Sequence, residues 1–88
     1  MSLPLTLYGA VDCDDTEHTR NRLRELSIPF REVTIDHDPD AERFVIFISG
    51  GNRSTPTLVF GDGKRKFILT EPTDDELALT LRESGWLP

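Results

Sequence analysis

Apolar and polar residues alternate in two segments of the first half of the chain. The first covers residues 3–8 and ends at Gly9, and the second covers residues 30–35. A period of two places successive side chains on opposite faces of an extended backbone, so both segments are predicted to be β-strands. Between them, residues 14–27 contain neither proline nor glycine and predict a helix with a thin apolar stripe. The stripe consists of Thr16, Thr19, Leu23 and Leu26.

The middle of the chain predicts a second helix and then a hairpin. Asp38-Pro39 is typical of a helix start, because aspartate is a common N-cap and proline is tolerated in the first turn. Apolar residues follow at helical spacing as far as Ile48. Two short apolar segments, residues 57–60 and 66–70, flank the turn sequence Gly-Asp-Gly, which predicts an antiparallel hairpin.

A capping-box pattern predicts a third helix. Thr73 is followed three residues later by Glu76, and Gly85 is a suitable C-cap. The predicted order of elements is therefore βαβαββα. Strand-helix-strand units of this length imply a parallel strand pair with a right-handed crossover. The expected fold class is α/β, with a four-stranded mixed sheet and three helices.

The composition predicts a single globular domain covering residues 1–88. Sixteen acidic residues against ten basic ones give a net charge of −6, which would repel a nucleic-acid backbone. The basic run Lys64-Arg65-Lys66 is explained as a solvated hairpin tip. Residues 1–9 resemble neither a secretion signal nor a membrane segment, and the chain's single cysteine cannot form an internal disulfide. We expect a cytoplasmic protein, and a monomer.

The single cysteine, Cys13, lies between the first strand and the first predicted helix. Helix N-termini stabilise a thiolate, and ligands bind beyond the carboxyl ends of strands in α/β sheets. Against this, the neighbouring carboxylates of Asp12, Asp14 and Asp15 disfavour a further negative charge. Position alone leaves open whether Cys13 is a reactive nucleophile or an inert, partly buried thiol.

The segment "GGNRSTPT", residues 50–57, resembles the glutaredoxin family, most closely its actinobacterial mycoredoxin branch. The family's thioredoxin-like fold has the same βαβαββα order. The resemblance covers nearly the whole chain. It extends over Tyr8, Cys13, Thr19-Arg20, Leu23, Asp36, Phe60, Gly63 and the segment "EPTDDEL" at residues 71–77.

The resemblance implies that Cys13 is catalytic and that Pro56 is cis, which would place Thr55 beside Cys13. It also implies a low-molecular-weight thiol, glutathione or mycothiol, as cofactor, and protein or small-molecule mixed disulfides as partners. The implied cofactor-binding residues are Arg53, Thr55, Pro56, Thr73 and Asp74. Simpler interpretations are that Arg53 is a solvated loop charge and that Thr73 only caps its helix. Tyr8 either flanks the cysteine or is an ordinary strand residue.

The chain departs from the family pattern at two places. The C-x-x-C motif is Cys13-Asp14-Asp15-Thr16, so dithiol chemistry is impossible and a monothiol oxidoreductase is the leading hypothesis. The Gly-Gly pair before the last helix is replaced by Glu71-Pro72, and Glu71 could repel an anionic end of glutathione. The alternatives are a redox-inactive module that binds a peptide in the cis-proline groove and, more weakly, an iron-sulfur cluster carrier. The aspartates would face an anionic cluster, so the last is disfavoured.

Two further clusters have structural explanations. Asp36-His37-Asp38 with Asp40 could be drawn as a metal site, but a strand-to-helix turn explains it better, and no metal is expected. His18, one turn after Cys13, could act as its base, but a surface histidine on a polar helix is the favoured interpretation. Trp86 is predicted to cover the core.

Overall fold

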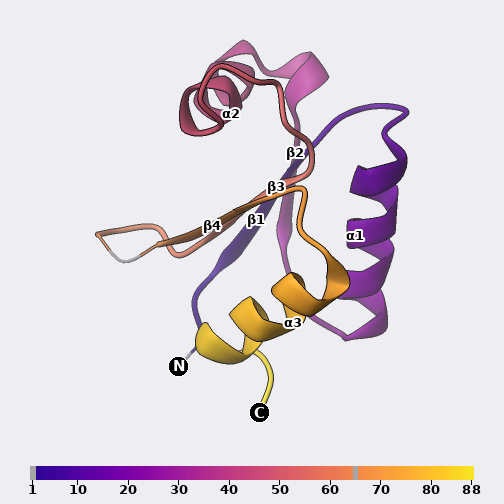
Figure 1. Ribbon diagram of the computed structural model, residues 1–88, viewed down its shortest axis with the longest axis vertical. Helices are drawn as coiled ribbons and strands as arrows, with labels where there is room; N and C mark the ends of the chain where they lie inside the picture. Colours follow the sequence, from indigo (N-terminus) through magenta and orange to yellow (C-terminus); the bar gives the residue numbers. More distant parts are fainter. Residues whose placement is uncertain (1, 65) are drawn as a thin grey trace.

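The computed structural model describes residues 2–64 and 66–88, and within them it has the predicted order of strands and helices (Figure 1). The second strand was expected to end at Ile35, but it ends at Thr34, and Ile35 is the first residue of a short 3₁₀ helix, η1. The elements are β1 (Leu5–Gly9), α1 (Asp14–Glu25), β2 (Arg31–Thr34), η1 (Ile35–His37), α2 (Pro39–Ile48), β3 (Thr57–Phe60), β4 (Phe67–Thr70) and α3 (Asp74–Glu83).

The four strands form one mixed sheet in the order β2-β1-β3-β4. β1 pairs in parallel with β2 and antiparallel with β3, and β3 pairs antiparallel with β4. The predicted α/β fold, with its parallel pair and its hairpin, is therefore confirmed. In the predicted hairpin tip, Arg65 lies outside the described residues, and β4 begins at Phe67, one residue later than expected.

The helices cover both faces of the sheet, with α1 and α3 on one side and α2 on the other (Figure 1). Side chains alternate along β1, so that Leu5 and Leu7 pack toward α1 and α3 while Tyr8 packs toward α2. The larger core cluster also contains Leu23, Leu58, Phe60, Leu77 and Leu81, and the smaller one contains Ile35, Ala41 and Val45. Covering on both faces explains why all of β3 is buried.

The two chain ends are held together beside α3. The backbone N–H of Leu3 donates to the Ser84 carbonyl at 2.9 Å, and the indole Nε1–H of Trp86 donates to the Leu3 carbonyl at 2.6 Å. The Trp86 ring packs against the larger core cluster, as predicted. The C-terminal residues therefore fix the entry of the chain into β1.

The helix ends show where the sequence pattern was accurate. Asp38, the residue before Pro39, is the N-cap of α2, and its side chain accepts a hydrogen bond from the Ala41 N–H. The capping box at the start of α3 is complete. The expected end of α1 at Ser27 is wrong, because Ser27 has a left-handed backbone with φ of 58° and the helix ends at Glu25.

Within residues 2–64 and 66–88, no helix is long and apolar enough to cross a membrane.

Candidate active site

Cys13 is the N-cap residue of α1 and lies just beyond the carboxyl end of β1. Its backbone is extended, and its carbonyl accepts the first hydrogen bond of the helix, from Glu17 N–H at 3.0 Å. The side chain is half-buried. The thiol therefore lies at the end of the helix where unpaired N–H groups point outward, which is the position expected from the sequence.

Thr55 lies directly beside the thiol, although 42 residues separate the two along the chain. The Cys13 Sγ atom is 3.4 Å from Thr55 Oγ1 and 3.7 Å from the Thr55 carbonyl oxygen. The Thr55–Pro56 peptide bond is cis, and both residues are buried. Three of the residues implied by the resemblance, Cys13, Thr55 and Pro56, are thus brought together at one point of the surface.

Hydrogen bonds lower the pKa of the Cys13 thiol. Partial burial is the largest single effect and raises this pKa, but four hydrogen bonds together outweigh it. They come from the side chains of Thr16 and Thr55 and from the backbone N–H groups of Thr16 and Asp15. The net result is a thiol more acidic than an ordinary cysteine, in spite of the adjacent aspartates.

A close contact between β1 and α1, which the sequence analysis missed, positions one of these hydroxyls. Thr16 stands where the family has its second cysteine, and only 1% of it is exposed. Its Oγ1 atom accepts a hydrogen bond from Ala10 N–H at 3.4 Å. A Cβ atom at Gly9 would lie 2.3 Å from Thr16 Cγ2, so glycine is required there. A glycine at a strand end facing a small residue of the next helix was the only sequence signal.

Arg53 is held by two carboxylates of the same chain. Its Nε donates to Glu42 Oε2 at 2.7 Å, and its Nη2 donates to Asp36 Oδ1. Asp36 Oδ2 also accepts the backbone N–H of Val11 at 2.8 Å. The Val11 N–H, followed by Arg53, holds the pKa of Asp36 below its ordinary value. Arg53 is therefore neither an isolated loop charge nor an unoccupied carboxylate clamp.

The start of α3 is also occupied by contacts within the chain. Thr73 N–H donates to Glu76 Oε1 at 2.9 Å, and Thr73 Oγ1 accepts from Glu76 N–H at 3.1 Å. Asp74 Oδ1 lies 2.9 Å from His18 Nε2, which links α3 to α1. The predicted cap is confirmed. His18 has Asp74 as its hydrogen-bond partner and remains largely exposed, as the sequence analysis favoured.

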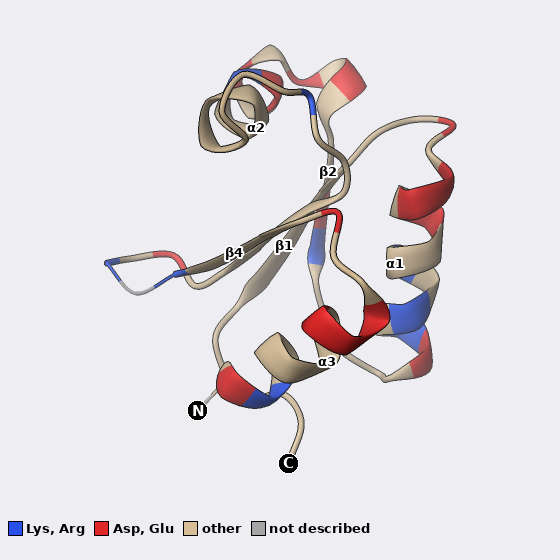
Figure 2. Ribbon diagram, in the orientation of Figure 1, with Lys and Arg blue, Asp and Glu red and all other residues tan. Residues whose placement is uncertain are grey.

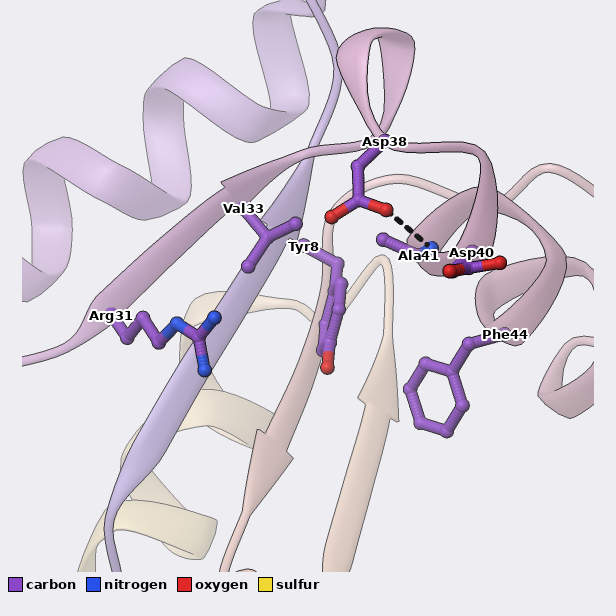
Figure 3. A pocket seen from close by; sticks show the side chains of 7 residues that line it. All are labelled: Tyr8, Arg31, Val33, Asp38, Asp40, Ala41 and Phe44. Atoms are coloured by element: carbon purple, nitrogen blue, oxygen red, sulfur yellow. Dashed lines mark hydrogen bonds between the residues drawn. The ribbon is translucent and has the colours of Figure 1, made fainter.

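Tyr8 contributes to a different part of the molecule. Its ring packs on Phe44 of α2 with the ring centroids 5.2 Å apart. Both rings line a pocket of about 320 Å³, together with Arg31 and Asp38. Figure 3 shows these side chains between the sheet and α2. Cys13 is not among the residues that line this pocket. Of the two expectations for Tyr8, the structure supports the simpler one, because Tyr8 is a residue of β1 whose ring packs on α2.

The surface around Cys13 is acidic. Acidic residues occupy the first turns of α1 and α3, and others lie near the start of α2 (Figure 2).

The segment Asp36-His37-Asp38 forms the turn between β2 and α2. Asp38 caps α2, in keeping with the interpretation of this segment as a strand-to-helix turn. Among the described residues, no group of three or more histidine, cysteine or acidic side chains is arranged to hold a metal ion.

Comparison with known proteins assigns this fold and site to a family. The glutaredoxin family model matches residues 5–65, which include β1, Cys13, the cis-proline segment and β3. A candidate glutaredoxin of Mycobacterium tuberculosis, found in strains H37Rv and CDC 1551, is 36% identical over 77 residues, covering 88% of each chain. The chain belongs to the glutaredoxin family and has its thioredoxin-like fold. This membership supports a thiol oxidoreductase role with glutathione-like thiols and mixed-disulfide partners.

Proposed function

We propose that this protein is a monothiol oxidoreductase that reduces mixed disulfides between proteins, or small molecules, and a low-molecular-weight thiol. The observation that carries the proposal is the placement of the chain's only cysteine. Cys13 caps a helix N-terminus, has a lowered pKa and lies 3.4 Å from Thr55 Oγ1, beside the cis-proline segment. Hydrogen bonds to the thiolate form and partial exposure are the features of a nucleophilic cysteine.

The reaction proceeds in two thiol-disulfide exchanges. The Cys13 thiolate attacks the cofactor-side sulfur of the mixed disulfide, forms a new S–S bond and releases the protein as a thiolate that takes up a proton. A second molecule of the thiol, as its thiolate, then attacks this bond. The attacking thiol and the cofactor bound to Cys13 then leave together as the cofactor disulfide, and Cys13 returns to its thiolate. One free thiol molecule is oxidised for each mixed-disulfide bond reduced, because the cofactor sulfur that came with the substrate stays at the disulfide level throughout.

The cofactor would lie between Cys13 and the cis-proline segment. In this proposal the backbone of Thr55 pairs with the thiol compound as an added strand does, and Pro56 forms the wall beside it. Arg53, Thr73 and Asp74 would line the site of the rest of the cofactor, although each is engaged within the chain. A lone thiol suits the reducing cytoplasm, where we propose that the protein acts as a monomer.

Mass spectrometry of the thiol adduct tests this proposal. Reduced protein incubated with glutathione disulfide or mycothiol disulfide should gain one cofactor, which a second thiol removes, and Cys13→Ser should gain none. Turnover of a glutathionylated or mycothiolated peptide should depend on Cys13 in the same way. If the wild-type protein forms no adduct and its thiol resists alkylation at neutral pH, the oxidoreductase proposal is wrong, and a peptide-binding role gains support.

A further inference from the structure

One of the two edges through which the Arg53 guanidinium could bind a ligand carboxylate is already occupied. A carboxylate binds arginine most strongly through two parallel hydrogen bonds from one edge of the guanidinium. Here the two nitrogens of one such edge, Nε and Nη2, donate to different partners, Glu42 and Asp36. The site thus contains the right cation for a carboxylate, with one side covered by carboxylates of the chain.

The charge of the cluster also weakens the binding of a carboxylate, in addition to the loss of these two hydrogen-bond donors. Two carboxylates surround one guanidinium, so the cluster of Asp36, Glu42 and Arg53 has a net charge of −1. An anionic ligand that approaches the remaining edge meets this excess negative charge. The side chains of Arg53 and Glu42 are 44% and 38% exposed, so the interaction is partly screened by solvent.

The two carboxylates have different structural duties. Asp36 also accepts the Val11 N–H at 2.8 Å and so holds the backbone two residues before Cys13. The Glu42 side chain makes its hydrogen bond to Arg53 and, within residues 2–64 and 66–88, no other. Removing the Glu42 carboxylate therefore uncovers Arg53, while Asp36 keeps the arginine and the cysteine loop in place.

We propose that Glu42 is a specificity-determining residue that withholds Arg53 from carboxylate-bearing thiols. With Glu42 present, a thiol that carries carboxylates gains little from Arg53, and a neutral thiol loses nothing. This inference rests on the proposed function, because it concerns the thiol that reacts at Cys13.

A pair of disulfide probes that differ only in their carboxylates isolates the effect. Glutathione disulfide and the disulfide of glutathione diethyl ester share their backbone and sulfur and differ in their carboxylates. The measured quantity is the ratio of their second-order rate constants for adduct formation on Cys13, in low-salt buffer. Glu42→Ala should raise the ratio of acid to ester by about two- to fivefold, the range expected for an exposed ion pair.

The control variant is Asp40→Ala. Asp40 also lies in the first turn of α2, pairs with Arg43 and carries the same charge, so it reproduces any general electrostatic effect. It should change the ratio less than Glu42→Ala. Adding Arg53→Gln to Glu42→Ala should abolish the gain. If adducts form but Glu42→Ala and Asp40→Ala shift the ratio equally, the role of Glu42 is refuted. If no variant forms an adduct with either disulfide, the proposed function itself fails.

Discussion

The protonation state of Cys13 depends on the groups that lie within hydrogen-bonding reach of its sulfur. The hydroxyls of Thr16 and Thr55 and two backbone N–H groups favour the thiolate, and burial opposes it. The carboxylates of Asp12, Asp14 and Asp15 are exposed, so water and salt screen them. At neutral pH, the folded protein therefore holds a larger fraction of thiolate than an ordinary cysteine.

Replacing the Thr16 hydroxyl tests this account. Thr16→Val keeps the methyl group beside Gly9 but removes a hydrogen bond to the thiolate, so the pKa of Cys13 should rise. Alkylation by iodoacetamide requires the thiolate, so the rate at neutral pH should fall several-fold and its midpoint should move to higher pH. The matched control is Thr19→Val, because Thr19 is also buried in α1 but is not among the groups that lower this pKa. Equal pH profiles for the two variants would contradict the role given to Thr16.

The site residues differ in how far the sequence could reveal them. Cys13 follows from its place at a strand-to-helix junction, and the position of Thr55 beside it follows only from the resemblance. The partners of Arg53 could not be predicted, because Asp36 and Glu42 lie 17 and 11 residues away in the chain. Only the return of α2 over the sheet brings these charges together.

At the scale of elements, the contact between the end of β1 and the first turn of α1 sets the position of the cysteine. Gly9 allows Thr16 to approach so closely that no Cβ atom fits between them. Local patterns predicted the type of every strand and α-helix. Those patterns could not predict the left-handed Ser27 that ends α1 or the 3₁₀ turn at Ile35, which depend on backbone geometry.

Gly9→Ala should destabilise the protein by about 1–3 kcal/mol, the usual cost of overpacking. Chemical denaturation measures this cost. Adding Thr16→Ser removes the clashing Cγ2 atom and should recover part of the loss, but not all, because Oγ1 and Cβ of Thr16 lie 3.3 and 3.4 Å from the added atom. Gly63→Ala is the control, since within the described part of the chain no atom beyond its two chain neighbours lies within 4 Å of its added Cβ. A Gly9→Ala variant as stable as Gly63→Ala would contradict the close contact.

At the scale of the whole molecule, the net charge of −6 is concentrated partly around the reactive end of α1 (Figure 2). Asp14 and Asp15 interact favourably with the N-terminal end of the helix dipole, which gives them a structural role. They also repel negative charge on the Cys13 sulfur and on any approaching disulfide. These long-range effects are separable from the hydrogen bonds because salt screens them, with a Debye length that falls from about 30 Å at 0.01 M to about 3 Å at 1 M.

The substitutions Asp14→Asn plus Asp15→Asn should therefore lower the pKa of Cys13 and speed its alkylation by neutral iodoacetamide. The same variant should react relatively faster with an anionic disulfide, dithiodipropionate, than with the cationic disulfide cystamine. Both changes should be larger at 0.01 M than at 1 M salt, because salt screens the two carboxylates. Both should be modest, because each exposed charge is worth about 1 kcal/mol or less even unscreened. Asp62→Asn plus Glu83→Gln changes the net charge equally at exposed positions of the β3–β4 turn and the end of α3. If this control has the same effect, net charge alone governs the reaction, and the local field of the aspartates around Cys13 does not.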